Sequence, residues 1–218
     1  MLEIEAKFLN VNISELVKKI KKCGGKKIHK MVMYKRYVFD LLNTTERGYI
    51  RVRDENGRIT MTLKKYPADS KFAQEYEILL DNNTTIETAR DFLIAQGYEV
   101  KAYHETLREK WAVAGCPEIA IDTLPGIPTY VELECKNEKE ITKLANLLGF
   151  DMKDAKYGPY VNQYIDYYNI NIDKPAIASL TFKNIDKELK VKQKDLLDFV
   201  KKMKKINLDI IKKNKIKN

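Results

Sequence analysis

The sequence is poor in the features that define several common classes of protein. No apolar run approaches the ~18 residues that a membrane-spanning helix needs, and the chain opens on a charged stretch that leaves no room for a signal peptide. The three cysteines, Cys23, Cys116 and Cys135, are scattered and lack a C-x-x-C spacing. We therefore expect a reducing, cytoplasmic setting without structural disulfides or a thiolate zinc site. No glycine stretch follows the phosphate-loop pattern G-x-x-x-x-G-K-[ST], and the two histidines, His29 and His104, are too far apart in the sequence for us to expect a catalytic role.

The positive charge of the chain is concentrated at its C-terminal end. Residues 183–218 hold thirteen lysines and five acidic residues, a balance of +8, whereas the whole chain of 218 residues carries a net charge of +9. Any nucleic-acid contact argued from charge therefore concerns this Lys-rich segment alone. Apolar residues at near-helical spacing between 195 and 211 predict an amphipathic helix that docks on the body of the protein or on a partner subunit. A phosphate backbone or an anionic membrane is the alternative contact. The apolar positions are Leu196, Val200, Met203 and Ile210.

Turn signals and apolar periodicity divide the rest of the chain into many strands and few helices. Helical spacing predicts helices near residues 13–23, from residue 84 or 85 to 97, and in a third segment that ends at Gly149. Asn56-Gly57 is the strongest hairpin dipeptide and separates two alternating stretches. Consecutive strands with few helices between them predict an α+β fold built on an antiparallel, barrel-like sheet. We expect strands at 3–7, 35–39, 49–53, 58–64, 74–80, 98–102, 106–113, 118–122 and 129–134.

Charged residues share one face of nearly every expected strand, because side chains alternate between the two faces of a sheet. If the helices cover the apolar faces from outside, the charged faces line the interior of a closed sheet. The alternative is an open sheet whose charged face is solvated. The expected interior set is Glu3, Glu5, Glu75, Glu77, Asp122, Glu132 and Glu134 together with Lys7, Arg51, Arg53, Lys64, Arg108 and Lys110.

An interior with so many charges of both signs indicates a ligand that also carries both signs. Burying these charges unpaired would cost several kcal/mol each. A polyphosphate with a bound divalent metal meets the requirement, because Arg and Lys bind phosphoryl oxygens and carboxylates bind a hard cation.

Several segments in a fixed order carry a family resemblance. Glu3-Ile-Glu-Ala-Lys7 looks like an E-x-E-x-K signature, Tyr49–Arg53 like an Arg-x-Arg strand, and Tyr130–Glu134 like a late E-L-E strand. Together they resemble the motifs of the CYTH superfamily, the triphosphate tunnel metalloenzymes. The further matches are Thr62-Leu63-Lys64 to the family's downstream Lys strand, Tyr37–Asp40 to its Tyr-Phe-Asp segment, Asp122 before the late strand, and Lys156-Tyr157 to a basic residue before a Tyr.

The resemblance implies a closed eight-stranded antiparallel β-barrel, a triphosphate tunnel with helices packed outside and a C-terminal helix. The tunnel domain would span residues 1–168, followed by a Lys-rich helical extension over 169–218. By the same analogy Mg²⁺ or Mn²⁺ is the cofactor, and Lys64, or Tyr34 or Tyr37, assists the attacking water. The implied phosphate-binding residues are Lys7, Arg51, Arg53, Lys64, Arg108, Lys110 and Lys156. The implied metal-side residues are Glu3, Glu5, Asp122, Glu132, Glu134, Glu75 and Glu77.

The implied function is metal-dependent hydrolysis of an inorganic or organic triphosphate, with release of the terminal phosphate. Tripolyphosphate, thiamine triphosphate and nucleoside triphosphates are the candidate substrates. A class IV adenylate cyclase, which converts ATP to cyclic AMP and pyrophosphate, would use the same tunnel. An RNA 5′-triphosphatase and a non-catalytic module that binds polyphosphate or nucleotides are further alternatives. The expected partner is thus a small-molecule triphosphate, with RNA 5′ ends as the only nucleic acid considered and a homodimer left open.

Overall fold

The computed structural model describes residues 2–42, 45, 47–170 and 179–216. The expected C-terminal extension lies partly outside this range, at residues 171–178 and 217–218. Among the described residues, no helix is both long and apolar enough to cross a membrane.

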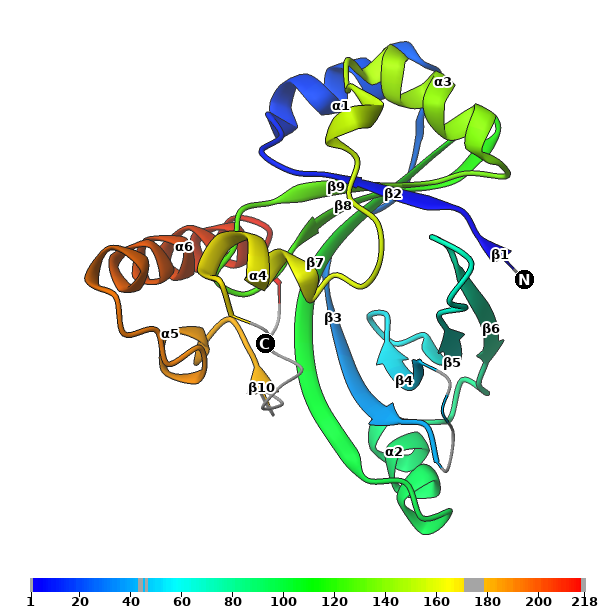
Figure 1. The fold of residues 1–218 in the computed structure, drawn as a ribbon, viewed down its shortest axis with the longest axis vertical. Helices are drawn as coiled ribbons and strands as arrows, with labels where there is room; N and C mark the ends of the chain where they lie inside the picture. Colours follow the sequence, from blue (N-terminus) through cyan, green and yellow to red (C-terminus); the bar gives the residue numbers. More distant parts are fainter. Residues whose placement is uncertain (1, 43–44, 46, 171–178, 217–218) are drawn as a thin grey trace.

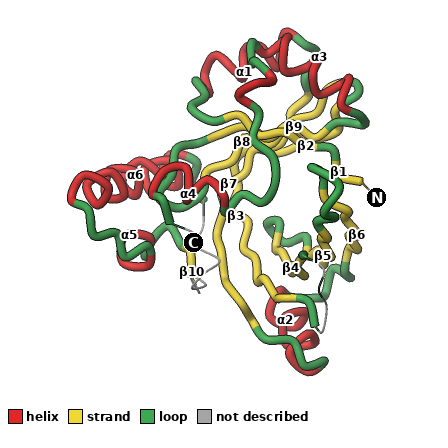
Figure 2. The backbone as a smooth tube through the Cα atoms, viewed as in Figure 1, coloured by secondary structure: helices red, strands yellow, loops and turns green. Residues whose placement is uncertain are grey.

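One strongly curved antiparallel sheet forms the body of the protein (Figures 1 and 2). Its strands follow the order β1-β6-β5-β4-β3-β7-β8-β9-β2, and a short strand, β10, pairs in parallel with β7. The bounds are β1 (Leu2–Glu3), β2 (Glu5–Phe8), β3 (Lys26–Asp40), β4 (Gly48–Asp54), β5 (Ile59–Lys65), β6 (Ala73–Leu79), β7 (Val100–Val113), β8 (Cys116–Thr123), β9 (Tyr130–Glu134) and β10 (Ser179–Leu180).

The two ends of this sheet are consecutive pieces of the same chain. β1 pairs with β6 and β2 pairs with β9, and only Ile4 separates β1 from β2. The N–H of Cys135 donates a hydrogen bond of 3.0 Å to the carbonyl of Ile4, which continues the contact with β9. The predicted antiparallel α+β architecture is confirmed. Hydrogen bonds between the terminal strands do not close the sheet, and its two ends are joined through the backbone at Ile4.

Two strands are longer than the sequence pattern suggests. The expected strands at 98–102 and 106–113 form the single strand β7, and β3 begins at Lys26 rather than at Lys35. These two strands pair with each other over most of their length, with register shifts that let the ladder bend. The hairpin between β4 and β5 is as predicted. Asn56 and Gly57 both have positive φ, and the carboxylate of Asp54 accepts a 2.6 Å hydrogen bond from the Gly57 N–H.

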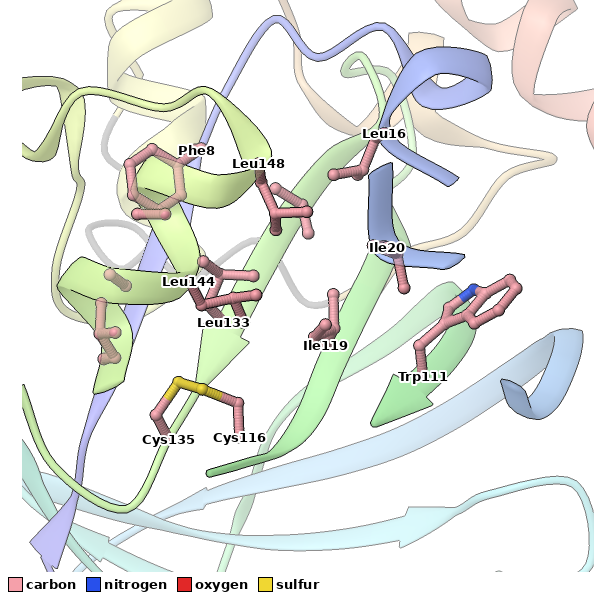
Figure 3. Packing of buried hydrophobic residues seen from close by; sticks show 14 of the residues in the cluster. Phe8, Leu16, Ile20, Trp111, Cys116, Ile119, Leu133, Cys135, Leu144 and Leu148 are labelled. Carbon is pink, nitrogen blue, oxygen red and sulfur yellow. A yellow bond between two sulfur atoms is a disulfide. The ribbon is translucent and has the colours of Figure 1, made fainter. Parts of the chain in front are cut away.

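Helices cover the apolar outer faces of the sheet, as the alternation requires. The bounds are α1 (Ile13–Lys22), α2 (Ile86–Ala95) and α3 (Glu138–Leu148), and their first turns are capped by Asn12, Thr85 and Asn137. Figure 3 shows Leu16 and Ile20 of α1 and Leu144 and Leu148 of α3 packed with Ile119 of the sheet. α2 packs in the same way on the far side, with Phe39, Val52 and Ile59. The polar faces of the strands are thereby turned inward.

The C-terminal segment docks on the outside of the sheet. It contains a 3₁₀ turn (Met152–Asp154), α4 (Asn162–Tyr168), α5 (Ile185–Glu188) and α6 (Lys194–Lys213), the last two coloured orange to red in Figure 1. Ile211 packs with Met33 and Leu107 of the sheet. Buried Asn207 accepts a 2.9 Å hydrogen bond from the Gly126 N–H. The predicted amphipathic helix is therefore confirmed, and its apolar face contacts the body of the protein.

The expectation that the chain lacks disulfides is wrong. Cys116 and Cys135 form a disulfide, visible in Figure 3, with their Cα atoms 3.9 Å apart. The two residues are 19 apart in the sequence, but β8 and β9 are antiparallel neighbours in which Glu118 pairs with Glu134. This pairing brings the cysteines side by side at one edge of the two strands. Cys23 is a free thiol.

Candidate functional site

The inward faces of the strands line a cavity of about 170 Å³. Its wall includes thirteen residues that the alternation predicts, which come from β1, β2, β4, β5, β6, β7, β8 and β9. They are Glu3, Glu5, Lys7, Arg51, Arg53, Lys64, Glu75, Glu77, Arg108, Lys110, Asp122, Glu132 and Glu134. The sequence pattern therefore brings the two signs of charge together on the inner face of the curved sheet, around one cavity.

On the side formed by β1, β5 and β6, Lys64 lies between two carboxylates. Its ammonium group is 2.6 Å from Glu3 and 2.9 Å from Glu75. Burial disfavours the cation, but neighbouring Tyr and Glu side chains hold the pKa of Lys64 well above its usual value. Burial would also raise the pKa of Glu75, but Lys64 and Arg51 lower it to about 2. For Glu3, burial outweighs the attraction of Lys64 and raises the pKa to about 8.

On the opposite side, Arg108 forms ion pairs with carboxylates of β8 and β9. Its guanidinium makes a bidentate contact with Asp122, with N–O distances of 2.8 and 2.6 Å. The same group lies 2.5 Å from Glu118 and 3.3 Å from Glu132. Burial disfavours the charge, yet these acids keep the pKa of Arg108 well above its usual value. The paired N–H groups of a guanidinium can donate to two oxygens of a phosphate as well as to the two oxygens of a carboxylate.

Lys7 links the site to the segment that follows the 3₁₀ turn (Met152–Asp154). Its ammonium group is 2.5 Å from Glu5 and 3.2 Å from Glu132. It also donates a 3.0 Å hydrogen bond to the carbonyl of Gly158. All three acceptors are oxygen atoms, and a phosphate group would also offer oxygen atoms to this ammonium group.

Three carboxylates lie side by side on neighbouring strands. Glu134 of β9 is in register with Glu5 of β2 on one side and with Glu118 of β8 on the other. Like charges at such positions repel each other. Burial, reinforced by Glu118, Glu132, Glu5 and Glu75, raises the pKa of Glu134 to about 7. A cation bound here would relieve the repulsion.

Several cavity residues were not among the predicted site residues. Glu118 follows the alternation of Ala120 and Asp122, so the same pattern could have found it. Arg36 stands next to Lys35 and only the strand register decides which of the two faces inward. Pro159 and Tyr160 follow the strands and carry no pattern signal. The further additions are Tyr49, Glu55, Arg58, Tyr66 and Tyr130.

Three predicted site residues, Tyr34, Tyr37 and Lys156, are not among the residues that line the cavity. The hydroxyl of Tyr37 accepts a 3.1 Å hydrogen bond from Arg90 of α2, because position 37 has the opposite orientation to Arg36. The Lys156 side chain is 53% exposed and lies 3.6 Å from Asp166. Its backbone instead pairs with that of Lys7. The structure therefore supports neither Tyr37 as a catalytic residue nor Lys156 as a phosphate ligand.

The role of Lys64 or Tyr34 in assisting the attacking water stays a prediction. Burial lowers the pKa of Lys64, but the neighbouring Tyr and Glu side chains raise it above its usual value and favour the charged form. Tyr34 is buried, donates to or accepts from His29 at 2.8 Å, and has a pKa of about 12 because of burial. The Tyr34 ring lies beside two arginines of the wall, 5.2 Å from the guanidinium carbon of Arg53 and 5.8 Å from that of Arg108.

The donor set fits a divalent metal that a bound ligand helps to hold. Among the described residues, no group of three or more His, Cys, Asp or Glu forms a ready metal site. Carboxylate oxygens nevertheless surround the cavity, and they are the ligands that Mg²⁺ and Mn²⁺ prefer. Mg²⁺ is commonly held by one or two carboxylates plus substrate phosphates. The residues present match that shared mode of binding.

The fold and the charged interior define a class of proteins in which a curved antiparallel sheet encloses a cavity lined by charged side chains. The CYTH domain model matches residues 1–157, and the chain belongs to this family. No curated protein matches the sequence.

Solved structures share the fold at low sequence identity. The PH1012 protein of Pyrococcus horikoshii OT3 is 21% identical over 72% of this chain and 96% of its own, with a TM-score of 0.61. A candidate adenylate cyclase from Vibrio parahaemolyticus is 18% identical over 73% of this chain and 95% of its own, with a TM-score of 0.59. The PH1819 protein of P. horikoshii is 20% identical over 75% and 98%, with a TM-score of 0.56.

Proposed function

We propose that this protein is a divalent-metal-dependent triphosphatase that releases the terminal phosphate of an inorganic or organic triphosphate. The observation that carries the proposal is the cavity wall, in which buried arginines and lysines alternate with carboxylates around a space of about 170 Å³. Such a wall complements an anionic chain that brings its own divalent cation.

In this proposal each ion-paired cation of the wall exchanges a carboxylate for a phosphoryl oxygen when the ligand enters. The phosphate-binding residues would be Lys7, Arg51, Arg53, Lys64, Arg108 and Lys110. The carboxylates that they release, together with those that are already crowded, would hold Mg²⁺ or Mn²⁺. The metal-side residues would be Glu3, Glu5, Glu75, Glu77, Asp122, Glu132 and Glu134. The metal ion would supply charge neutralisation on the phosphoryl oxygens.

The chain's own residues would then position the substrate for an in-line attack by water on the terminal phosphorus. A bond forms from the water oxygen to phosphorus, and the bond to the bridging oxygen breaks. The electron pair passes to the diphosphate leaving group, whose charge the arginines and lysines stabilise, while a cavity carboxylate accepts the proton of the water. Phosphoryl transfer requires little more from a protein than this positioning and electrostatic stabilisation.

The character of the wall favours hydrolysis of a triphosphate over cyclisation of ATP. The described residues that line the cavity are charged side chains, tyrosines and Pro159, without a Val, Leu, Ile, Met or Phe. A volume of about 170 Å³ is also below the ~300 Å³ at which pockets for larger organic ligands begin. The triphosphate would fill the cavity and an organic group would remain outside. Cyclase activity is kept as the second candidate because the V. parahaemolyticus structure is described as that of a candidate adenylate cyclase.

The test is to incubate the protein with Mg²⁺ or Mn²⁺ and tripolyphosphate, thiamine triphosphate, ATP or RNA bearing a 5′-triphosphate, and to identify the products. We expect release of orthophosphate, with tripolyphosphate as the best substrate. The variants Glu5→Ala and Arg53→Ala should lose nearly all activity, whereas Arg90→Ala, outside the cavity, should retain it. Full activity in both cavity variants would rule out this site. Cyclic AMP as the main product from ATP would favour the cyclase, and tight binding without turnover would favour a binding module.

A further inference from the structure

Arg36 differs from every other cation in the cavity wall. Within the described part of the chain, the remaining lysines and arginines of the wall each form an ion pair with at least one carboxylate. Arg36 forms none, although it is only 5% exposed. Its contacts are a 2.5 Å hydrogen bond to the hydroxyl of Thr106 and the face of the Tyr160 ring, 4.8 Å from the guanidinium carbon. Its Nε has no hydrogen-bond partner.

The electrostatic surroundings of Arg36 are also unusually positive. It is in register with Arg53 on the neighbouring strand, and Arg108 contributes a third guanidinium nearby. Burial and the like charges of Arg51, Arg108 and Arg36 lower the pKa of Arg53, against the attraction of Glu55. Asp122 attracts Arg36, but both of its oxygens already accept hydrogen bonds from Arg108. A buried charge in this position is costly unless an anion joins it.

The wall beside Arg36 comes from the segment after the matched family domain. That domain ends at residue 157, whereas Pro159 and Tyr160 line the cavity and Gly158 accepts a hydrogen bond from Lys7. The Tyr160 hydroxyl also contacts Nδ1 of His104. Arg36 is thus held between β7 and this segment, with its guanidinium stacked on an aromatic ring and available to the cavity.

We propose that Arg36, which stacks on Tyr160, is a phosphate-binding residue. It binds one phosphoryl group of the ligand at the part of the wall formed by residues 158–160. This inference rests on the proposed function, because it assigns a further residue to the same site. The occupant of this subsite is then a phosphoryl group. The guanidinium group of Arg36 has no carboxylate partner among the described residues, and its N–H groups match the geometry of two phosphate oxygens.

The experiment compares Arg36→Gln with Arg90→Gln, a matched control on the outer face. Arg90 also stacks on a tyrosine, with its guanidinium carbon 5.1 Å from the Tyr37 ring. Binding of tripolyphosphate is measured by calorimetry in EDTA, and thermal unfolding is measured without ligand. We expect Arg36→Gln to bind tripolyphosphate about 10- to 100-fold more weakly, as for loss of a charge-assisted hydrogen bond. Its unliganded melting temperature should equal or exceed that of the wild type, because an unpaired buried charge is removed.

Arg36→Lys should recover part of the lost affinity, and in turnover assays with Mg²⁺ the loss should fall on KM more than on kcat. Wild-type affinity in a folded Arg36→Gln would overturn the inference. So would failure of both Arg36→Gln and Arg36→Lys to fold, since Arg36 would then be a structural residue. If the wild type binds tripolyphosphate neither in EDTA nor with Mg²⁺, the proposed function fails. If the wild type binds and Arg36→Gln binds equally, only the role of Arg36 fails.

Discussion

The crowding of carboxylates around Glu134 predicts that the ligand-free protein loses stability as the pH rises. The pKa of Glu134 is raised from 4.5 to about 7 by burial and by four neighbouring acids. A carboxyl group with a raised pKa holds its proton more tightly in the folded state than in the unfolded state. Folding is therefore favoured when the group is protonated, and this contribution is lost as the pH rises from about 4.5 through about 7.

The size of the effect follows from the shift. At about 1.4 kcal/mol for each pKa unit, the shift corresponds to roughly 3 kcal/mol, and partial exposure of Glu134 reduces this to about 2 kcal/mol. The variant Glu134→Gln removes the charge and keeps the shape. It should match the wild type at pH 5 and exceed it by about 2 kcal/mol at pH 8, which is roughly 4–8 °C in melting temperature for a chain of this size.

The assay is thermal or urea unfolding in EDTA at pH 5, 6.5 and 8. Glu138→Gln is the control, because the side chain of Glu138 is 60% exposed at the start of α3. Addition of Mg²⁺ at pH 8 should stabilise the wild type more than Glu134→Gln, since the cation relieves the repulsion that the variant lacks. Equal stability of Glu134→Gln and the wild type at pH 8 would refute the reasoning about this cluster.

Three further changes test other parts of the structure. Reduction of the disulfide between Cys116 and Cys135 should lower the free energy of unfolding by up to about 3 kcal/mol, from the entropy of the closed loop, as measured by urea unfolding with and without dithiothreitol. A reduced protein of unchanged stability would mean that the bond contributes nothing. Asn207→Ala should cost about 1–3 kcal/mol in the same assay, because it leaves the buried N–H of Gly126 without its acceptor, and no cost would contradict tight docking of α6. Tyr37→Phe should retain triphosphatase activity, since the Tyr37 hydroxyl contacts only Arg90 among the contacts described above; a large loss of activity would return Tyr37 to the site.

Alternation along the strands carried most of the prediction. Side chains alternate between the two faces of a strand, so the charged face of each strand can be read from the sequence. Because the helices cover the apolar faces, Glu132 and Glu134 could be placed on the inner face with Glu3 and Glu5 before any strand pairing was known. The outward placement of the helices followed from their apolar stripes. The length of β7 was missed because polar residues in its middle, such as His104 and Glu105, conceal the continuity of the strand.

Other features depend on information that a single sequence does not contain. Cys116 and Cys135 become neighbours only through the pairing of β8 with β9. The inward orientation of Arg36 depends on strand register, because Lys35 beside it is equally basic. The resemblance to the family motif predicts Tyr37 as a site residue. Neighbouring side chains on a strand point to opposite faces, however, so Tyr37 faces outward because Arg36 faces inward. Family motifs located the site, but orientation within each strand decided which residues belong to it.

The cavity wall is a network of ion pairs between its lysines and arginines and its carboxylates. Lys64 lies between Glu3 and Glu75, and Arg108 holds Asp122 with the fork that would bind a phosphoryl group. Within the described part of the chain, each lysine and arginine of the wall except Arg36 forms an ion pair with an acid. Under the proposed function, an entering phosphate chain would displace those acids, and the displaced carboxylates would then be free to bind a cation. Anion and divalent metal would therefore stabilise each other's binding through the same set of side chains, and by linkage the coupling would be equal in both directions.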